Sequence, residues 1–241
     1  MTGDGNWLSR SAALLGDEAM ARLAKAHVLV VGVGGVGSWC AEALARTGVG
    51  RLTLVDDDLV AASNVNRQCP ATAKTIGRRK VEVMRELLLE INPSLDVAAV
   101  AARYPAGTPG LDLAAFDVVI DAIDSVDCKA QLVCVATEAG VPLFSSMGAA
   151  RRLDPTKVVL RRFDKVEGDG LARALRQRFK KTGRFPKKSF LCAVSTEPAF
   201  PLPPTTDGAP APKGSLMPVT CAFGMVLASA SLQSLCASSR P

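Results

Sequence analysis

Short apolar runs alternate with longer segments of helical periodicity through the first 150 residues of the chain. The runs are rich in valine, leucine and isoleucine, which is typical of strands buried on both faces of a parallel sheet. We expect strands at 27–31, 51–55, 95–100, 116–120 and 141–145, with helices at 11–26, 38–47, 74–91 and 127–139. This alternation predicts an α/β fold, a Rossmann-like, doubly wound and mostly parallel sheet covered by helices.

The pattern changes after residue 150. Residues 151–188 are basic, with helical periodicity over 170–181, whereas residues 198–215 are rich in proline and glycine and favour a mobile loop. Residues 219–235 are apolar but contain several serines and a threonine. For this last segment we expect a helix packed inside the protein or across a dimer interface, and no integral membrane span.

Composition agrees with a folded chain of this class. It is 48% apolar and only 5% aromatic, which favours helices packed on an aliphatic sheet over an aromatic-rich β-sandwich. We predict a Rossmann-like nucleotide-binding part at 1–150 and a basic, proline-rich C-terminal extension at 151–241. In this prediction the basic segment, the loop and the last helix complete the same domain.

The positive charge of the chain is concentrated in one segment. Residues 151–188 hold fourteen Lys or Arg and four Asp or Glu, a local charge of +10, which leaves the remainder near −4 against a total of +6. Such a segment is a candidate contact for an anionic partner.

The seven cysteines show no regular spacing and no C-x-x-C pair, so neither a disulfide framework nor a paired-cysteine zinc site is expected. Residues 1–10 lack the apolar core of a signal peptide. We therefore expect a reducing, intracellular compartment. The cytoplasm is the first choice, and an organelle stays open.

A glycine-rich motif, Gly-Val-Gly-Gly-Val-Gly at 32–37, lies between the first predicted strand and the next helix. Its glycines (Gly32, Gly34, Gly35 and Gly37) permit a tight turn and let backbone N–H groups approach a phosphate at the helix N-terminus. Asp56 ends the second predicted strand nineteen residues after Gly37, where it can accept hydrogen bonds from a ribose. These residues alone also fit a dehydrogenase.

Two cations and a further carboxylate favour an ATP site over the dinucleotide site of a dehydrogenase. Arg67 lies in Ser-Asn-Val-Asn-Arg-Gln at 63–68, and Lys80 follows thirteen residues later; fixed cations beside a ribose-binding aspartate suit a triphosphate. Asp124 follows the fourth strand and could hold Mg²⁺ on the phosphates. Taken singly, Asp121 or Asp124 also fits a helix N-cap and Lys80 a solvated helix charge, so the inference rests on the joint pattern.

The joint pattern resembles the adenylating domain of the ubiquitin-activating superfamily. The resemblance is carried by the glycine motif, by Leu-Val-Asp-x-Asp at 54–58, by the motif at 63–68, by Lys80 and by Asp-Ala-Ile-Asp at 121–124. It covers about residues 10–150 and implies ATP and Mg²⁺ as cofactors.

The resemblance also implies roles for single residues. Asp56 would bind the ribose and Asp124 the Mg²⁺ ion. Arg67 and Lys80 would bind the phosphates and, with Asp124, form the catalytic set. Asp58, Asn64 and Gln68 would line the pocket beside the four motif glycines.

A narrower resemblance is to the tRNA threonylcarbamoyladenosine dehydratase branch. It is carried by Gly-Val-Gly-Ser-Trp at 35–39, by 121–126 with Lys129, by Asp-Pro-Thr-Lys at 154–157 and by Ser-Thr-Glu at 195–197. Members of that branch use ATP to activate the carboxylate of the threonylcarbamoyl group beside the anticodon, and the group then cyclises with loss of AMP. The resemblance implies a tRNA substrate, and the basic residues 151–188 suit its phosphate backbone.

The main alternative is an adenylating activator of a ubiquitin-like or sulfur-carrier protein, which would bring a sulfur-transfer partner. Such activators often use a catalytic cysteine, and Cys192 and Cys221 stay open for that role. A nicotinamide oxidoreductase is disfavoured by the two cations, and a non-catalytic scaffold by the intact candidate set. By analogy we expect a homodimer, in which Arg10 could reach the partner's site and the helix at 219–235 could form the interface.

Overall fold

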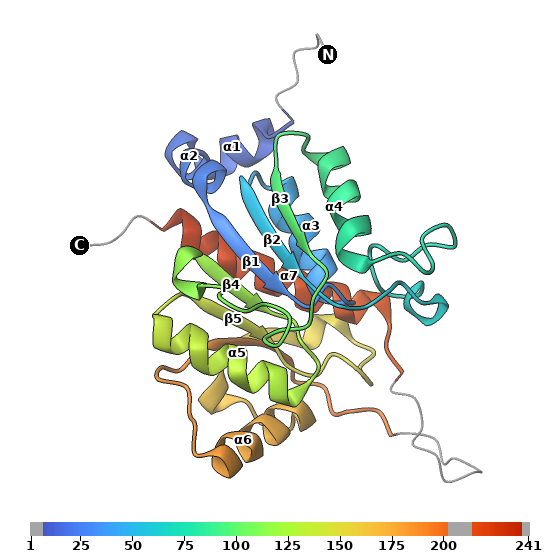
Figure 1. Ribbon diagram of the computed structural model, residues 1–241, viewed down its shortest axis with the longest axis vertical. Coiled ribbons are helices and arrows are strands. Elements are labelled where there is room, and N and C mark those ends of the chain that lie inside the picture. The colour runs from blue at the N-terminus through green and yellow to red at the C-terminus, as the bar shows by residue number, and fades with distance from the viewer. Residues whose placement is uncertain (1–6, 202–213, 238–241) are drawn as a thin grey trace.

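A seven-stranded sheet forms the centre of the computed structural model, which describes residues 7–201 and 214–237 (Figure 1). The strand order is β3-β2-β1-β4-β5-β7-β6, and every neighbouring pair is parallel except β6 and β7. The winding direction reverses between β1 and β4, the kind of place where doubly wound sheets bind ligands. The strands are β1 (His27–Val31), β2 (Arg51–Val55), β3 (Asp96–Val100), β4 (Val118–Asp121), β5 (Leu143–Ser146), β6 (Val158–Arg162) and β7 (Leu191–Ser195).

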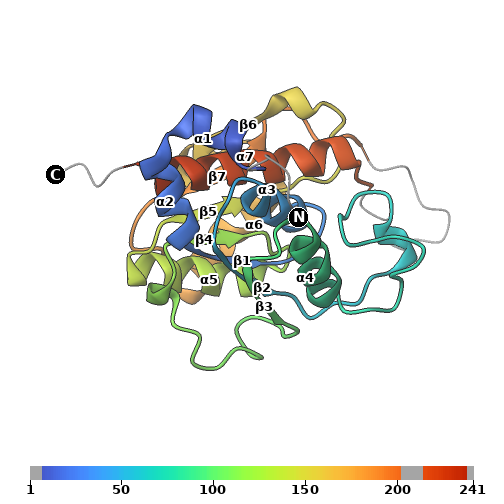
Figure 2. The ribbon, with the colours of Figure 1, turned by 90° about the horizontal axis from the view of Figure 1, so that it is seen from above.

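Helices cover both faces of the sheet. One face packs against α3, α4 and α7, and α7 in turn contacts α2; the other face packs against α5 and α6 (Figures 1 and 2). In Figure 1, α7 crosses behind the strands. The helices are α1 (Ser9–Leu15), α2 (Asp17–Lys25), α3 (Gly37–Arg46), α4 (Lys80–Ile91), α5 (Val126–Ala139), α6 (Gly170–Thr182) and α7 (Met217–Cys236). The predicted α/β class with a mostly parallel, doubly wound sheet is confirmed.

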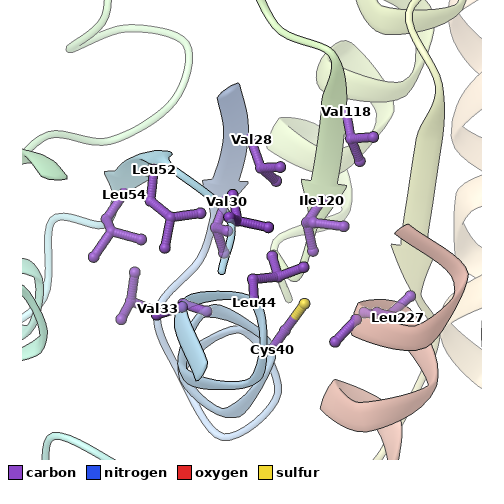
Figure 3. Close-up of a cluster of buried hydrophobic side chains, with 14 of the residues drawn as sticks. Val28, Val30, Val33, Cys40, Leu44, Leu52, Leu54, Val118, Ile120 and Leu227 are labelled. Carbon is purple, nitrogen blue, oxygen red and sulfur yellow. The ribbon is translucent and has the colours of Figure 1, made fainter. Parts of the chain in front are cut away.

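Side chains of the central strands alternate between two hydrophobic cores. Val28 and Val30 of β1 point toward α3, where they lie near Leu44 (Figure 3). Leu29 and Val31 point to the opposite face and join the core that includes α5 and α6. Because both faces of β1 are buried, the strand is apolar at every position after its first residue.

The strands expected from residues 116 and 141 begin two residues later, at Val118 and Leu143. Two predicted helices differ from the structure by more than one residue. The helix expected at 11–26 is divided at Gly16, whose φ of 79° is a conformation that side-chain-bearing residues rarely adopt. The helix expected from residue 74 begins only at Lys80. Before it, the Thr75 hydroxyl donates to the Pro70 carbonyl (2.7 Å) and accepts from the Thr72 N–H (2.8 Å), so side-chain hydrogen bonds hold a turn there instead.

The sequence prediction missed two strands after residue 150. β7 is short and buried, whereas β6 lies at the sheet edge with Arg161 and Arg162 exposed. Charged residues on an edge strand discourage further pairing but hide the apolar alternation that identifies a strand. The helix predicted at 170–181 is confirmed as α6, and of the predicted loop at 198–215, residues 202–213 lie outside the described part.

The last helix, α7, is long and apolar enough to cross a membrane by length and composition alone. Its packing supports the predicted internal helix instead. Val219, Phe223 and Leu227 are fully buried, and α7 approaches α3 so closely that a Cβ on Gly224 would lie 2.7 Å from the Val36 carbonyl oxygen. Only a glycine permits this backbone contact.

Candidate functional site

The carboxyl ends of β1, β2, β4 and β5 meet at one cavity of about 910 Å³, at the reversal of the sheet's winding. This volume lies in the range of about 300–1,000 Å³ typical of small-molecule sites. We call the wall formed by residues 31–80 the glycine-loop half, and the wall formed by residues 146–174 the β5–α6 half. The loops after β3 and β4 complete the cavity.

The four motif glycines divide into two structural roles. Gly34 and Gly35 line the cavity, directly before α3 begins at Gly37. Gly32 lies at the mouth of β1 with φ of 92°, and a Cβ on Gly37 would lie 1.9 Å from the Gly32 carbonyl oxygen, so Gly37 closes the turn and does not line the cavity. The resulting loop places Gly34, Gly35 and the positive end of α3 at the cavity, an arrangement suited to an anion.

Asp56 is held in the glycine-loop half by backbone contacts. Its two carboxylate oxygens accept hydrogen bonds from the N–H groups of Val33 (2.7 Å) and Asp58 (2.9 Å). Burial raises the pKa of this carboxyl, while the nearby charge of Lys80 and the two N–H groups act in the opposite direction. The side chain therefore presents fixed acceptor oxygens to the cavity, as recognition of ribose hydroxyls requires.

Lys80 occupies the first position of α4, where a cation opposes the helix dipole. Its side chain is 5% exposed, and its Nζ donates to Asp58 Oδ2 at 2.6 Å, while the Asp58 side chain is 64% exposed. Both residues line the cavity. A buried cation facing a polar cavity, at an electrostatically unfavourable end of a helix, is typical of a functional group.

Asn64, Arg67 and Gln68 also line this half. The Arg67 guanidinium donates to the Ser63 carbonyl (2.8 Å) and to Asn66 Oδ1 (3.0 Å). Gln68 is 7% exposed, and its Oε1 atom has no hydrogen-bond partner among residues 7–201 and 214–237.

The aspartate that ends β4, Asp121, and the aspartate that follows the strand, Asp124, have different surroundings. The suggestion that Asp121 caps a helix is wrong: Asp121 is fully buried at the end of β4 and pairs with Lys129, also fully buried, at 2.7 Å. Ser145 donates to the same carboxylate at 2.7 Å. Asp124 is exposed on the cavity wall, and its carboxylate forms no hydrogen bond or salt bridge within the described ranges. The carboxylates of Asp56, Asp57 and Asp58 lie within 4.8 Å of one another.

The β5–α6 half holds residues that the sequence prediction did not single out. Three arginines line it, Arg151, Arg152 and Arg173, together with the buried Asp169, which caps α6 through the Ala172 N–H (2.8 Å). Arg103, from the loop after β3, lines the cavity as well. The charge excess over 151–188 was the available signal, but charge counting cannot tell an inward-pointing arginine from a solvated one.

The rest of the basic segment has mixed surroundings. Arg176 donates to the carbonyls of Phe163 (2.8 Å) and Val166 (2.6 Å), which gives it a structural role. Arg178 and Arg184 pair with carboxylates of α5. Arg162 pairs with Asp164 at 3.1 Å. The exposed cations Arg161, Lys180 and Lys181 form no ion pair with the described part of the chain.

The cysteines left open by the sequence lie away from the cavity wall. Burial raises the pKa of Cys192 and of Cys221, which keeps both thiols protonated and poorly nucleophilic. Cys128, in the first turn of α5, does line the cavity and interacts with the Arg103 side chain. Sequence spacing gave no sign of that position.

Residues 8–241 match the ThiF family. The chain belongs to the ThiF family. Among ThiF-family relatives, the tRNA threonylcarbamoyladenosine dehydratase of Escherichia coli is 38% identical over 249 residues, which span 94% of this chain and 92% of that protein. The crystal structure of the E. coli dehydratase in complex with AMP superposes with a TM-score of 0.83, at 38% identity, over 94% of this chain and 92% of the other. Its complex with ATP gives a TM-score of 0.81 at 36% identity, over 95% and 93%.

Proposed function

We propose that this ThiF-family protein is an ATP-dependent dehydratase that cyclises threonylcarbamoyladenosine next to the tRNA anticodon. The observation that carries the proposal is the near full-length match to the E. coli dehydratase, whose solved structures contain ATP and AMP. The cavity agrees with it, because the candidate residues of the glycine-loop half converge on one volume large enough for a nucleotide.

The glycine-loop half would hold ATP. Asp56 offers carboxylate oxygens to the ribose, and the N–H groups of Gly34 and Gly35 face the phosphates together with Arg67 and Lys80. The side-chain amide of Gln68 lies beside this loop through its Nε2. Its Oε1, which has no partner among the described residues, would gain one from the nucleotide.

Mg²⁺ would be held at Asp124, which has an exposed carboxylate on the cavity wall, as an oxygen ligand that this ion prefers. When bound, the ion would neutralise charge on the phosphates. Asp56, Asp57 and Asp58 supply further carboxylates to the same cavity from the glycine-loop half.

The proposed reaction has two steps. A substrate carboxylate oxygen attacks the α-phosphorus of ATP in line, pyrophosphate leaves, and Arg67 and Lys80 stabilise the charge that develops. A neighbouring nitrogen or oxygen of the substrate then attacks the activated carbonyl and expels AMP, which carries away the carboxylate oxygen. The net change in the nucleoside is the loss of one water, and no enzyme thiol takes part.

The tRNA would approach along the exposed cations of residues 151–188, of which Arg161, Lys180 and Lys181 are examples. A tRNA substrate also agrees with the expected cytoplasmic location. The homodimer and any sulfur-transfer partner remain predictions by analogy. The exposed apolar residues Met217 and Met225 of α7 are the first place to search for an interface.

The test is to incubate purified protein with ATP, Mg²⁺ and tRNA carrying the linear threonylcarbamoyl group, and to analyse the nucleosides by mass spectrometry. We expect a product lighter by one water, formed with release of AMP. Absence of this product, together with pyrophosphate exchange stimulated by a carrier protein ending in Gly-Gly, would contradict the proposal and favour the activator of a carrier protein.

A further inference from the structure

Arg152 is a buried cation of the β5–α6 half. The residue is 4% exposed, and its Nε and Nη1 atoms are buried without any hydrogen-bond partner in the described part of the chain. No salt bridge of Arg152 occurs there either. An unpaired buried charge is strongly destabilising, so a structure that retains one normally supplies its partner from a ligand.

The segment around Arg152 is anchored on both sides. Arg151 adopts φ of 62°, its N–H donates to the Gly214 carbonyl (2.8 Å) and its Nε to the Phe200 carbonyl (2.7 Å). On the other side, the Leu153 N–H donates to the carboxylate of Glu197 (2.9 Å to Oε2). Glu197 also accepts from Asp154, at 3.0 Å, so its carboxylate is occupied by backbone N–H groups. The anchored backbone fixes the position of Arg152 at the cavity wall.

The side chain lines the cavity in the β5–α6 half. Asp169 is the buried carboxylate of that half, and its oxygens accept from the Ala172 N–H (2.8 Å) and the Gly148 N–H (3.0 Å). Arg151 and Arg173 add further positive charge there. In this half the arginines outnumber the one buried carboxylate, and that carboxylate accepts from backbone N–H groups. The glycine-loop half already has its own cations, Arg67 and Lys80, for phosphates.

We propose that Arg152 binds the carboxylate of the threonylcarbamoyl group and so selects the tRNA substrate; this inference rests on the proposed function. A guanidinium donates two parallel hydrogen bonds to a carboxylate and fixes its plane as well as its position. The cation also offsets the repulsion between the carboxylate and the phosphates of ATP, which must come together for adenylation.

The test compares two tRNA samples that differ only in the threonylcarbamoyl group, binding to wild-type protein and variants without ATP. We expect wild-type protein to bind the carboxylate-bearing tRNA more tightly, by roughly tenfold or more, the value of a hydrogen-bonded charge pair. Arg152→Gln should abolish this preference. Arg161→Gln removes one charge from an exposed position of the same segment and should keep the preference.

Arg152→Lys keeps the buried charge and serves as the second variant if Arg152→Gln fails to fold. Because an ammonium cannot form two parallel hydrogen bonds to a carboxylate, the Arg152→Lys variant should lose most of the preference, while its Tm stays equal to that of wild-type protein. A preference kept by the folded variants overturns the inference. Weaker ATP binding with the preference intact would also overturn it and would assign Arg152 to a phosphate of ATP. An equal loss of affinity for both tRNAs would overturn it as well and would assign Arg152 to the RNA backbone.

Failure of the proposed function is recognised separately. If wild-type protein forms no cyclised nucleoside, the proposed function itself is wrong. If wild-type protein cyclises the nucleoside but shows no preference between the two tRNAs, the dehydratase function stands and the role of Arg152 is overturned.

Discussion

The two halves of the cavity differ in how far the protein satisfies its own charges. In the glycine-loop half, Asp56 accepts two backbone N–H groups, Lys80 pairs with Asp58, and Arg67 donates to Ser63 and Asn66. In the β5–α6 half, the guanidinium of Arg152 has buried atoms with no partner among the described residues. The first half is preorganised by the chain alone, whereas the second requires an anion to complete it.

This difference agrees with the proposed division of labour. ATP is an invariant ligand, so its half can be assembled from one compact stretch of chain, residues 31–80. The group to be activated belongs to a large RNA, and the half that receives it is formed by a segment that also carries exposed cations. The unpaired guanidinium of Arg152 then contributes to substrate recognition, since only a substrate with a carboxylate neutralises its charge.

The largest expected effect is on stability, when the buried ion pair of Asp121 and Lys129 between the two halves is broken. Asp121 ends β4 in the middle of the sheet, and Lys129 contacts it together with Ser145 and the Ser146 carbonyl of β5. Lys129→Ala leaves an uncompensated buried carboxylate and should lower the free energy of unfolding by about 3–5 kcal/mol. Thermal unfolding should show a Tm lower by roughly 10 °C or more.

The double variant Asp121→Ala/Lys129→Ala removes both charges and serves as the control. It should be less destabilised than Lys129→Ala, because no charge is left unpaired. If the double variant is destabilised by the sum of the two single changes, the pair is not coupled as described.

The next largest expected effect is on the rate, and it distinguishes the role of the glycine-loop half from that of the β5–α6 half. Lys80→Ala removes a phosphate-side cation and should lower kcat by about 10²–10³-fold, as loss of one preorganised donor does at other sites. The preference for carboxylate-bearing tRNA should persist, because Arg152 is intact. Steady-state AMP release checks the rate, and Lys74→Ala, at an exposed position outside the cavity wall, is the matched control.

Lys80 has an exposed partner in Asp58, so we expect only a small change in Tm for Lys80→Ala. A loss of thermal stability that parallels the loss of activity would contradict a role in catalysis.

A smaller expected effect is the pH dependence of ATP affinity, which tests the role of Asp56 in binding the ribose. Burial raises the pKa of Asp56 above that of an ordinary aspartate, for which it is about 3.9. As the pH falls, this carboxylate takes up a proton earlier than others and loses acceptor capacity, so ATP affinity should decline at a pH where ordinary aspartates are still ionised. Asp56→Asn should bind ATP weakly and without this pH dependence, measured by titration calorimetry against the wild-type profile.

The smallest effect concerns the thiol on the cavity wall. Cyclisation within the substrate needs no enzyme nucleophile, so Cys128→Ser should cyclise the nucleoside at about the wild-type rate. The alternative activator of a carrier protein would lose acyl transfer if it used this thiol. A labelled thioester trapped on Cys128 during turnover would count against the dehydratase reaction.

Local signals were sufficient for most of the first 150 residues. The strands at 27–31 and 51–55 were predicted at their observed bounds, because a short run of apolar and β-branched residues that stops at a glycine or an aspartate is typical of a buried strand. The predicted residues of the glycine-loop half lie on one cavity, apart from Gly37, which closes the turn behind it. Gly34 and Gly35 lie in the turn after β1, and Asp56 directly follows β2.

The remaining features depended on contacts distant in sequence. Whether Asp121 caps a helix or pairs with Lys129 depends on the packing of α5 against the sheet. The position of β6 depends on its pairing with β7, more than twenty residues later. The inward direction of Arg152 depends on anchors at Phe200 and Gly214.

The sequence by itself therefore determined the fold class, the glycine loop and the carboxylate and cations placed around it, because strand periodicity and turn chemistry are properties of neighbouring residues. Only the tertiary structure decided which of fourteen basic residues in 151–188 point into the cavity and which remain in solvent. Charge is visible in a sequence, but burial of a charge is a property of the whole fold.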